Sequence, residues 1–266
     1  MNPVSIRDTS FDELELPEVI YKYRSWTNPF HLEVISKKVL YMASPSEFTD
    51  PHDCKNPIGY DLLTDKDIFN IYLYHSKKDH KNWSREKHRS FAREWLKNTP
   101  LKNSQYVSEM QEEYFRDFHL HFGVLSLTGN PSNDQMWTSY SENHQGFCIG
   151  FNTVLLFDHL GGGGIVNYYD TLPIIRPAPL HSYEQQHILQ VFSKLRQWEY
   201  EQEYRTHKFY PNGATRDQRL INVPPQAFKE IIFGNKMPDP IKEQILLSIP
   251  DDLGHLLLKE ENSPNS

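Results

Sequence analysis

The sequence predicts an α+β fold, with a mixed, mostly antiparallel sheet at its core, flanking helices and a helical insertion. Short segments rich in β-branched and aromatic residues recur along the chain, and helical segments of unequal length separate them. No regular βαβ repeat is present, which argues against a doubly wound parallel sheet. A chain of 266 residues is long for one domain and short for two, so we expect a single domain over residues 1–266.

The first elements are expected to follow a mobile acidic leader at about residues 1–16. Val19–Arg24 is aromatic and β-branched, as in a strand, and residues 39–43 are predicted to form a second strand. Between them, Asn28 and the Pro that follows it are typical of a helix N-cap and first helical position. Residues 44–53 are rich in Pro, Ser and Asp and are expected to form a polar loop.

Residues 61–118 are expected to form the helical insertion, because apolar side chains recur there at helical spacing. Its stretch 77–97 holds eight Lys and Arg against three Asp and Glu, the most basic composition in the chain. One interpretation is a docking surface for nucleic acid or an acidic partner, with Trp83 and Trp95 stacking on bases. The other is a solvated helix whose aromatic side chains face the core, which the shared apolar stripe favours.

The second half of the chain is expected to alternate strands and helices. Strands are predicted at 122–127, 147–151, 165–169, 204–210, 220–223, 231–233 and 256–258. A short helix is expected from Asp134 to His144, and a longer one begins at the capping box of Ser182 and Gln185 and continues to Trp198. A last helix opens at Asp239, and a disordered tail is expected at about 260–266.

Composition limits the classes of function. A net charge of −7 argues against indiscriminate binding to nucleic acid. The two cysteines, Cys54 and Cys148, favour reduced thiols in a cytoplasmic protein over a disulfide framework. The N-terminus lacks the pattern of a secretory signal, and no apolar stretch approaches the ~20 residues that span a bilayer, so no membrane partner is expected.

The strongest catalytic motifs are absent from the sequence. It contains no HExxH, no CxxC pair, no GxSxG and no GxGxxG after a strand. His119 and His121 would share one side of a strand, but no acidic or Cys partner stands at ligand spacing, so no metal is expected.

One candidate site segment begins at Asp134. Asp134, Trp137, Tyr140 and His144 are spaced three, three and four residues apart, which places them along one face of a helix. Ordinary packing accounts for the aromatic residues, whereas Asp134 and His144 need a partner or a ligand when they are drawn toward a core. The pattern fits a site lining and plain packing equally well.

The second candidate segment is 194–205, which holds Lys194, Trp198, Glu201, Glu203 and Arg205. A helix that ends near Glu201 and a strand that starts near Glu203 place carboxylates where the chain turns, a common position for functional sites. The alternative is a solvated helix end with Glu203 and Arg205 paired on the strand. We therefore expect one polar site, drawn mainly from 134–151 and 194–205.

At these residues the chain resembles a family catalogued as domain of unknown function 2971. The resemblance runs in order through YKYRS at 21–25, LYMASPSEFTDPHD at 40–53, MWTSYSENHQGFCIGF at 136–151 and KLRQWEYEQEYR at 194–205. The second block departs from the family pattern, because Thr49 and His52 stand where the family usually has Asn and Phe. This resemblance implies no particular reaction.

A weaker resemblance does imply one. ADP-ribosyltransferases of one class have an Arg on an early strand, then Ser-x-Ser, then a late Glu-x-Glu, and this chain is similar in order, with Arg24, then Ser44 and Ser46, then Glu201 and Glu203. Pro45 departs from the pattern, since it would interrupt a strand through the Ser-x-Ser segment.

The resemblance implies NAD as co-substrate, no metal, and defined roles for the site. Glu203 would hold the ribose hydroxyl and stabilise the oxocarbenium charge, while Glu201 would orient or deprotonate the acceptor. Arg24 would clamp the pyrophosphate. The other residues expected to bind the cofactor are Tyr23, Ser44, Ser46, Trp137, Tyr140, His144 and Arg205.

The implied function is transfer of ADP-ribose from NAD to a macromolecular acceptor, in bacterial defence or as a toxin. The alternative is a non-catalytic regulatory module that binds a nucleotide or partner in the same pocket and tolerates loss of Glu203. A hydrolase that uses His144 with Asp134 or Asp53 ranks below both, because no nucleophile or metal signature supports it.

Overall fold

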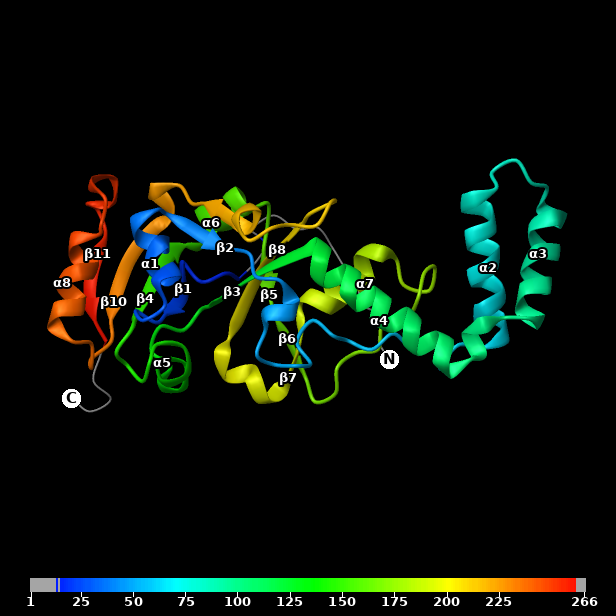
Figure 1. Cartoon of the computed structure of the whole chain (residues 1–266), viewed down its shortest axis with the longest axis horizontal. Coiled ribbons are helices and arrows are strands. Elements are labelled where there is room, and N and C mark those ends of the chain that lie inside the picture. Colours follow the sequence, from blue (N-terminus) through cyan, green and yellow to red (C-terminus); the bar gives the residue numbers. More distant parts are fainter. Residues whose placement is uncertain (1–12, 14, 262–266) are drawn as a thin grey trace.

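The fold is built around a seven-stranded sheet, and the computed structural model describes Glu13 and residues 15–261 (Figure 1). The strand order is β11-β10-β4-β1-β3-β8-β5. The strands are β1 Val19–Arg24, β3 Phe122–Thr128, β4 Phe147–Asn152, β5 Gly164–Ile165, β8 Glu203–Phe209, β10 Phe228–Phe233 and β11 Leu257–Glu260. All neighbours pair antiparallel except β10 and β11, so the predicted α+β class with a mixed, mostly antiparallel sheet is confirmed.

Two small sheets flank the main one. β2 (Val39–Tyr41) pairs antiparallel with β9 (Leu220–Asn222), and β6 (Asn167–Tyr169) pairs parallel with β7 (Ser193–Leu195). The predicted strand at 165–169 is therefore divided between two sheets, because Ile165 pairs with β8 and Asn167 with β7.

Eight α-helices are present in the described part of the chain. They are α1 Pro29–Ser36, α2 Asp65–Asp79, α3 Arg85–Lys97, α4 Ser104–His121, α5 Asp134–Tyr140, α6 Thr153–Leu160, α7 Tyr183–Val191 and α8 Asp239–Leu247. Short 3-10 turns include η2 Pro45–Glu47, η3 Pro100–Lys102 and η4 Arg196–Glu201. None of the helices described is both long and apolar enough to cross a bilayer.

The local helix signals act as expected. The Asn28 side chain accepts a hydrogen bond from the Phe30 amide, and Pro29 occupies the first turn of α1. Ser182 and Gln185 exchange both hydrogen bonds of a capping box at the start of α7.

The hydrophobic core lies against the middle of the sheet. Its fully buried members come mainly from β1, α1, β4, α6 and β10, and include Ile20, Ile35, Ile149, Phe157 and Ile231. Leu16, which falls in the expected leader, packs against this core, and the expected tail is ordered as far as β11 and Glu261. The remaining residues of the expected leader and tail, 1–12, 14 and 262–266, lie outside the described part.

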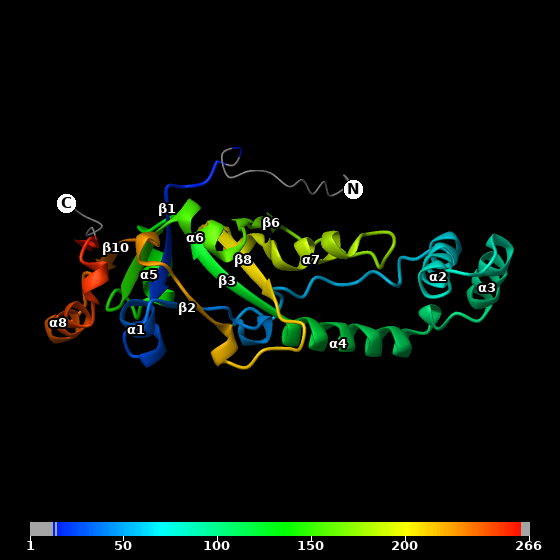
Figure 2. The ribbon, with the colours of Figure 1, turned by 90° about the horizontal axis from the view of Figure 1, so that it is seen from above.

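The stretch 61–118 contains α2, α3 and α4 and projects away from the sheet (Figures 1 and 2). α4 runs outward from the sheet, and the α2–α3 hairpin lies at its far end. The expectation that His119 and His121 lie on a strand is wrong, because both residues belong to the last turn of α4, which ends at His121.

Two predicted helices are too long. The predicted helix from Ser182 to Trp198 ends at Val191, because Ser193 and Lys194 are instead drawn into the β6–β7 pairing and are both buried. The helix expected from Asp134 to His144 ends at Tyr140. Glu142, Asn143 and His144 follow with positive φ, so the chain turns back toward β4 rather than continuing the helix.

Candidate functional site

The site begins where two central strands separate. β1 pairs with β4 over six positions, but its register with β3 is a single pair, Tyr21 with Thr128. Beyond that pair, strand alternation brings Lys22 and Arg24 to one face of β1, and the backbone of β3 no longer fills the space beside them. Lys22 crosses the gap and donates from Nζ to the Ser126 carbonyl oxygen at 2.6 Å.

Two cavities meet at this gap. The first, about 300 Å³, is named the carboxylate cavity, and it is lined by residues that include Lys22, Arg24, Tyr140, Lys194, Glu201 and Glu203. The second, about 710 Å³, is named the arginine cavity, and its lining includes Arg24, Phe30, Tyr41, Arg116, Arg216 and Arg219. Lys22, Arg24 and Ser126 line both, so the two cavities adjoin at the separated strands.

Three buried carboxylates and two buried cations form an ion-pair cluster, and all of them except Arg205 line the carboxylate cavity. Lys194 Nζ donates to Glu201 Oε2 and, at 3.1 Å, to Glu203 Oε2, and lies 3.6 Å from Asp53 Oδ2. Arg205 holds Asp53 through two bonds of 2.8 and 2.6 Å and holds Glu203 through two bonds of 2.7 and 3.0 Å. The five groups are all 6% exposed or less, and three carboxylates against two cations leave one net negative charge.

Within this cluster, neighbouring opposite charges keep Glu203, Lys194 and Arg205 ionised. Burial alone raises the pKa of the Glu203 carboxyl, but Arg205 and Lys194 outweigh it and keep that pKa well below its usual value. Burial lowers the pKa of Lys194, and Glu203, Asp53 and Glu201 more than restore it. Glu203 and Lys194 are therefore both ionised over the whole physiological pH range.

A left-handed residue sets the directions of the two glutamates. Glu201 ends η4 and Glu203 begins β8, and Gln202 between them has φ 45° and ψ 54°. In a continuous strand, residues two apart point to the same face, but here one glutamate belongs to a helical turn, so the Gln202 conformation is needed to turn both toward Lys194. The Tyr140 hydroxyl donates to Glu201 Oε1 at 2.6 Å and the Thr128 hydroxyl donates to the Glu201 carbonyl at 2.6 Å.

Lys22 and Arg24 differ from the other cations of the site. Neither lies within ion-pair distance of a carboxylate in the described part of the chain, and the buried Arg24 Nε has no hydrogen-bond partner there. Burial lowers the pKa of Lys22 to about 7, with a further contribution from the charge of Arg24. Burial likewise lowers the pKa of Arg24, to about 10. Two poorly compensated cations beside an open cavity are suited to an anionic ligand.

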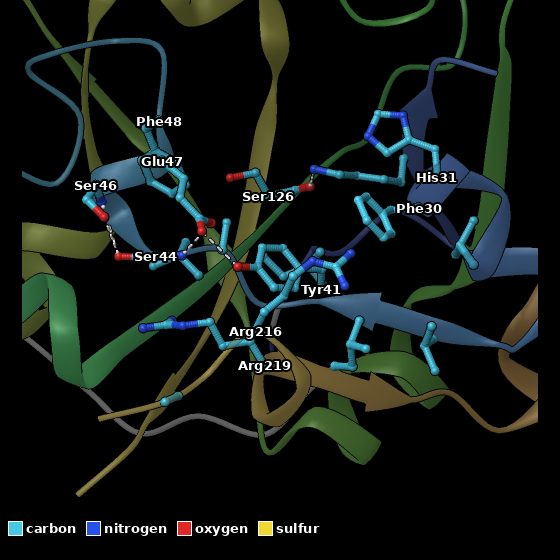
Figure 3. A pocket seen from close by; sticks show the side chains of 18 of the residues that line it. Phe30, His31, Tyr41, Ser44, Ser46, Glu47, Phe48, Ser126, Arg216 and Arg219 are labelled. Atoms are coloured by element: carbon cyan, nitrogen blue, oxygen red, sulfur yellow. Dashed lines mark hydrogen bonds between the residues drawn. The ribbon is translucent and has the colours of Figure 1, made fainter. Parts of the chain in front are cut away.

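The arginine cavity combines cations with aromatic rings (Figure 3). The Arg216 guanidinium lies 3.6 Å from the centroid of the Phe30 ring and 5.8 Å from that of Tyr41. The Tyr41 hydroxyl donates to Glu47 Oε1 at 2.8 Å. Arg219, by contrast, is buried and donates to backbone carbonyls of Met42, Phe122, His119 and Leu120, so it holds the wall together.

The Ser-x-Ser segment lies in this second cavity. Ser44 and Ser46 line it, with their hydroxyl oxygens 2.8 Å apart, and Ser44 also donates to the His119 carbonyl. Pro45 is the first residue of η2, where the missing amide hydrogen costs nothing, so the chain here forms a capped turn rather than a strand.

The predicted site residues divide into three groups, one of which is the pair Ser44 and Ser46 in the arginine cavity. Tyr23, Arg24, Tyr140, Glu201 and Glu203 line the carboxylate cavity together, although they come from separate parts of the chain. The Tyr23 hydroxyl is turned to the Asn130 carbonyl at 3.0 Å, so its ring rather than its hydroxyl faces the cavity.

Trp137, His144 and Arg205 are not part of either lining. Trp137 is fully buried, donates to the Pro131 carbonyl and packs edge-on against Tyr23. His144 bonds Glu261 at 2.7 Å and stacks beside Trp137. Arg205 uses all five of its N–H donors on Asp53, Glu203 and the Val191 carbonyl, so it positions the carboxylates and has no donor left for a ligand.

Lys22 and Ser126 are the site residues that sequence reasoning missed. The available signal was a Lys two positions before Arg24 within an otherwise aromatic and apolar strand, where a charged residue needs a reason to be buried. No cluster of three or more His, Cys, Asp and Glu side chains suited to a metal occurs among residues 13 and 15–261.

Comparison with known proteins adds one match. The model of a family described as Protein of unknown function (DUF2971) matches residues 136–206, and no curated protein and no solved structure matches the chain. The match spans α5 to β8 and so contains Tyr140, Lys194, Glu201 and Glu203, whereas Lys22, Arg24 and Asp53 lie outside it. The acidic half of the candidate site thus lies within a segment similar to this family of proteins of unknown function.

Proposed function

We propose that the chain binds NAD across the two cavities and transfers ADP-ribose to a macromolecular acceptor. The observation that carries this proposal is the meeting of Arg24, Tyr140, Glu201 and Glu203 in one cavity, where an unpaired cation faces a pair of carboxylates. A ligand that offers an anion to one wall and a developing cation to the other fits such a site. NAD has both, in its diphosphate and in the ribose that loses nicotinamide.

The diphosphate is assigned to Lys22 and Arg24. Both line the two cavities where they adjoin, and neither has a described carboxylate partner. Bonds from guanidinium to phosphate are charge-assisted and commonly bidentate, and a buried Arg that lacks a partner at Nε gains most from them. The same anion would also favour the protonated form of Lys22.

The ribose is assigned to the side of the carboxylate cavity at Glu201 and Glu203. As the bond from C1′ to the nicotinamide nitrogen breaks, its electron pair leaves with nicotinamide and positive charge develops on the ribose. The buried ion-pair cluster carries one net negative charge, which stabilises the positive charge on the ribose in surroundings with little water. The cluster consists of Asp53, Lys194, Glu201, Glu203 and Arg205. The acceptor nucleophile then bonds to C1′, and its proton passes to Glu201.

Acceptor capacity differs between the two carboxylates. An ionised carboxylate has about four lone-pair positions. Glu201 accepts one bond at each oxygen, from Tyr140 and Lys194, whereas Glu203 accepts two bonds from Arg205 and one from Lys194, and the Ser126 side chain is a further hydrogen-bond partner. A ribose hydroxyl that donates to Glu203 would therefore take the place of Ser126, and Arg205 keeps Glu203 ionised and aimed.

A second function is favoured by the same ion pairs. Glu203 is held by two cations and Glu201 by one, an arrangement that also suits a rigid wall in a non-catalytic module that binds a nucleotide. Such a module would need Lys22 and Arg24 but not the carboxylates. Loss of Glu203 therefore separates the two functions.

The test is incubation with NAD labelled in its adenylate part and cell extract, followed by separation of labelled macromolecules. We expect the native protein to transfer label and Glu203→Gln to lose about 10²-fold or more of that activity. Glu199→Gln is the matched control, since Glu199 lies in the same turn but is exposed and paired with Arg196. It should transfer label normally.

Binding and folding are measured alongside. NAD binding by calorimetry should survive in Glu203→Gln and fail in Arg24→Met, while thermal unfolding reports whether each variant is folded. If Glu203→Gln perturbs folding, Tyr140→Phe provides the second variant, because it removes one hydrogen bond to Glu201 and leaves the ion pairs intact. Undiminished transfer by folded Glu203→Gln would refute the catalytic role, and NAD binding without transfer would favour the regulatory module.

We also propose a cytoplasmic location and a role in bacterial defence or as a toxin. Cys54 and Cys148 are both free and buried, which suits a reducing compartment.

A further inference from the structure

The α2–α3 hairpin is the most basic part of an otherwise acidic chain. Residues 77–97 carry eight Lys and Arg against three Asp and Glu, a net charge of +5; because the whole chain carries −7, the rest carries −12. The hairpin also stands farthest from the sheet, at the end of α4 (Figures 1 and 2). Positive charge is thus concentrated at a projecting tip.

These charges are not neutralised within the described part of the protein. None of the eight basic residues lies within ion-pair distance of a described carboxylate, and all eight are exposed. Elsewhere on the surface many basic residues are paired, as in Lys37 with Glu33, Lys102 with Asp65 and Arg196 with Asp170. The tip therefore keeps its full attraction for an external anion.

Four of the basic residues follow one another along α3 at intervals of four residues. They are Arg85, Arg89, Arg93 and Lys97. An interval of four in a helix separates successive side chains by about 6 Å along the axis, so the four form a ridge. Like charges at this interval repel and destabilise a helix. The chain thus keeps a costly arrangement that packing does not require.

The hairpin holds together without these charges. Ile68 and Ile71 of α2 and Ala92 of α3 are buried, and His88 bonds Ser76 across the two helices at 3.0 Å. Thr64 and Ser84 cap the two helix starts. Lys78, Lys87 and Arg89 lie over the rings of Tyr183, Trp83 and Phe69. The other five basic side chains have no ion pair or ring contact with a described residue.

The aromatic residues belong to this packing. Trp83 stacks on His80 with ring centroids 3.9 Å apart, and Lys87 lies 4.3 Å from the Trp83 ring. Trp95 lies beside Tyr72 and Phe91. Trp95 is 42% exposed, but a single exposed ring does not form a row of stacking platforms for unpaired bases, so the tip offers mainly cations.

We propose that the α3 ridge binds the phosphate backbone of duplex nucleic acid. Rows of Lys and Arg without base-stacking groups are suited to contacts that position a duplex through its phosphates and carry no sequence preference. The acidic remainder of the chain repels the duplex, so contact is confined to the tip. The net charge of the whole chain argues against indiscriminate binding by its whole surface.

The test uses the full chain and fluorescence anisotropy with a short fluorescein-labelled DNA duplex and an RNA duplex of the same sequence. The variant is Arg85→Gln, Arg89→Gln and Arg93→Gln combined, which removes repulsion along α3 and should leave the hairpin folded. The matched control is Lys37→Gln, Lys208→Gln and Lys229→Gln combined, which removes the same charge from the sheet region. Circular dichroism checks the helical content of each.

We expect the native protein and the control to bind at least one duplex, with an affinity that falls linearly with salt on logarithmic axes. The ridge variant should bind about tenfold more weakly or worse, and its salt slope should be smaller by about 2 to 3. The two duplexes show whether DNA or RNA geometry is preferred. Failure to bind either duplex, equal weakening in the control, or displacement of the duplex by polyglutamate at equal charge concentration would overturn the proposal.

Discussion

The burial of Lys22 lowers the stability of the folded protein, and the same residue lies at the candidate functional site. It stands on a central strand, its ammonium group has one backbone acceptor, and the strongest influence on its charge after burial is the unfavourable one of Arg24. A methionine of similar length would have no charge to bury and would therefore make the folded protein more stable. The lysine is retained where two cavities meet, which is the position a phosphate ligand would need.

The first prediction is that Lys22→Met stabilises the protein, and more at pH 7 than at pH 10. The pKa of Lys22 is 10.5 when unfolded and about 7 when folded, so between these values the unfolded state binds more protons. The burial penalty is complete below pH 7 and fades as the pH rises toward 10.5. Urea unfolding should show a gain on the order of 2 kcal/mol at pH 7 and little at pH 10.

Lys208→Met is the control for Lys22, because Lys208 is exposed on β8. It should change the free energy of unfolding by less than about 0.5 kcal/mol at either pH. A gain for Lys22→Met that is the same at both pH values would show that Lys22 is not the titrating group.

Arg205 pairs with two buried carboxylates, and its loss leaves Asp53, Glu201 and Glu203 with Lys194 as the one remaining cation of the cluster. The second prediction is that Arg205→Met lowers the free energy of unfolding by about 3 to 5 kcal/mol. Arg196→Met, which removes exposed pairs with Asp170 and Glu199, should cost less than about 1 kcal/mol. Urea unfolding at pH 7 measures both, and equal losses would contradict the structural role of the buried cluster.

Elements whose bounds depend on residues close together in the sequence were predictable. The bounds of β1 match the prediction, and the caps at Asn28 and Ser182 form the expected bonds. These features depend on residues within a few positions of one another. The polar residues of the two site segments likewise predict that Tyr140, Glu201 and Glu203 share one site, and all three line the carboxylate cavity.

Elements whose bounds depend on residues far away in the sequence were not predictable. The helix expected to run through Trp198 stops at Val191 because Lys194 is buried among Asp53, Glu201 and Glu203, and Asp53 stands far from it in sequence. The helical spacing of apolar residues within this segment cannot indicate a partner so far away in the sequence. The separation of β1 from β3, which opens the site to Lys22, is likewise a property of strand register and not of either strand alone.

The third prediction concerns the turn that aims the glutamates. Gln202 has a positive φ, which costs a side chain about 1 kcal/mol and costs glycine nothing. Gln202→Gly should therefore keep the free energy of unfolding within about 1 kcal/mol, while Gln202→Val should lower it by about 2 kcal/mol, since β-branched residues tolerate this conformation least. Urea unfolding ranks the two, and a valine variant as stable as the glycine variant would show that the turn is not under this constraint.

At the scale of the whole molecule, two charged regions are kept apart. Residues of β1, β3 and β8 line the cavities in the acidic remainder of the chain. The helix that carries the basic ridge, α3, lies at the far end of α4 (Figure 2). Thr64 caps the start of α2 and Lys102 ends η3, and Asp65 and Lys102 lie 2.7 Å apart in an ion pair. The two ends of the α2–α3 hairpin therefore lie close together, so a short linker could join the residues that flank it.

The last prediction is that a short Gly-Ser linker can replace residues 65–101 with little effect on the cavities. This deletion removes the contact of Lys78 with the Tyr183 ring and the Asp67–Arg176 ion pair. The partners of that ion pair are partly exposed, so it contributes less than about 1 kcal/mol. Thermal unfolding should show one cooperative transition, NAD affinity should stay within about twofold, and duplex binding should disappear. If NAD affinity fell together with duplex binding in this folded variant, the hairpin and the cavities would form one site, because separate sites with no coupling free energy lose their ligands independently.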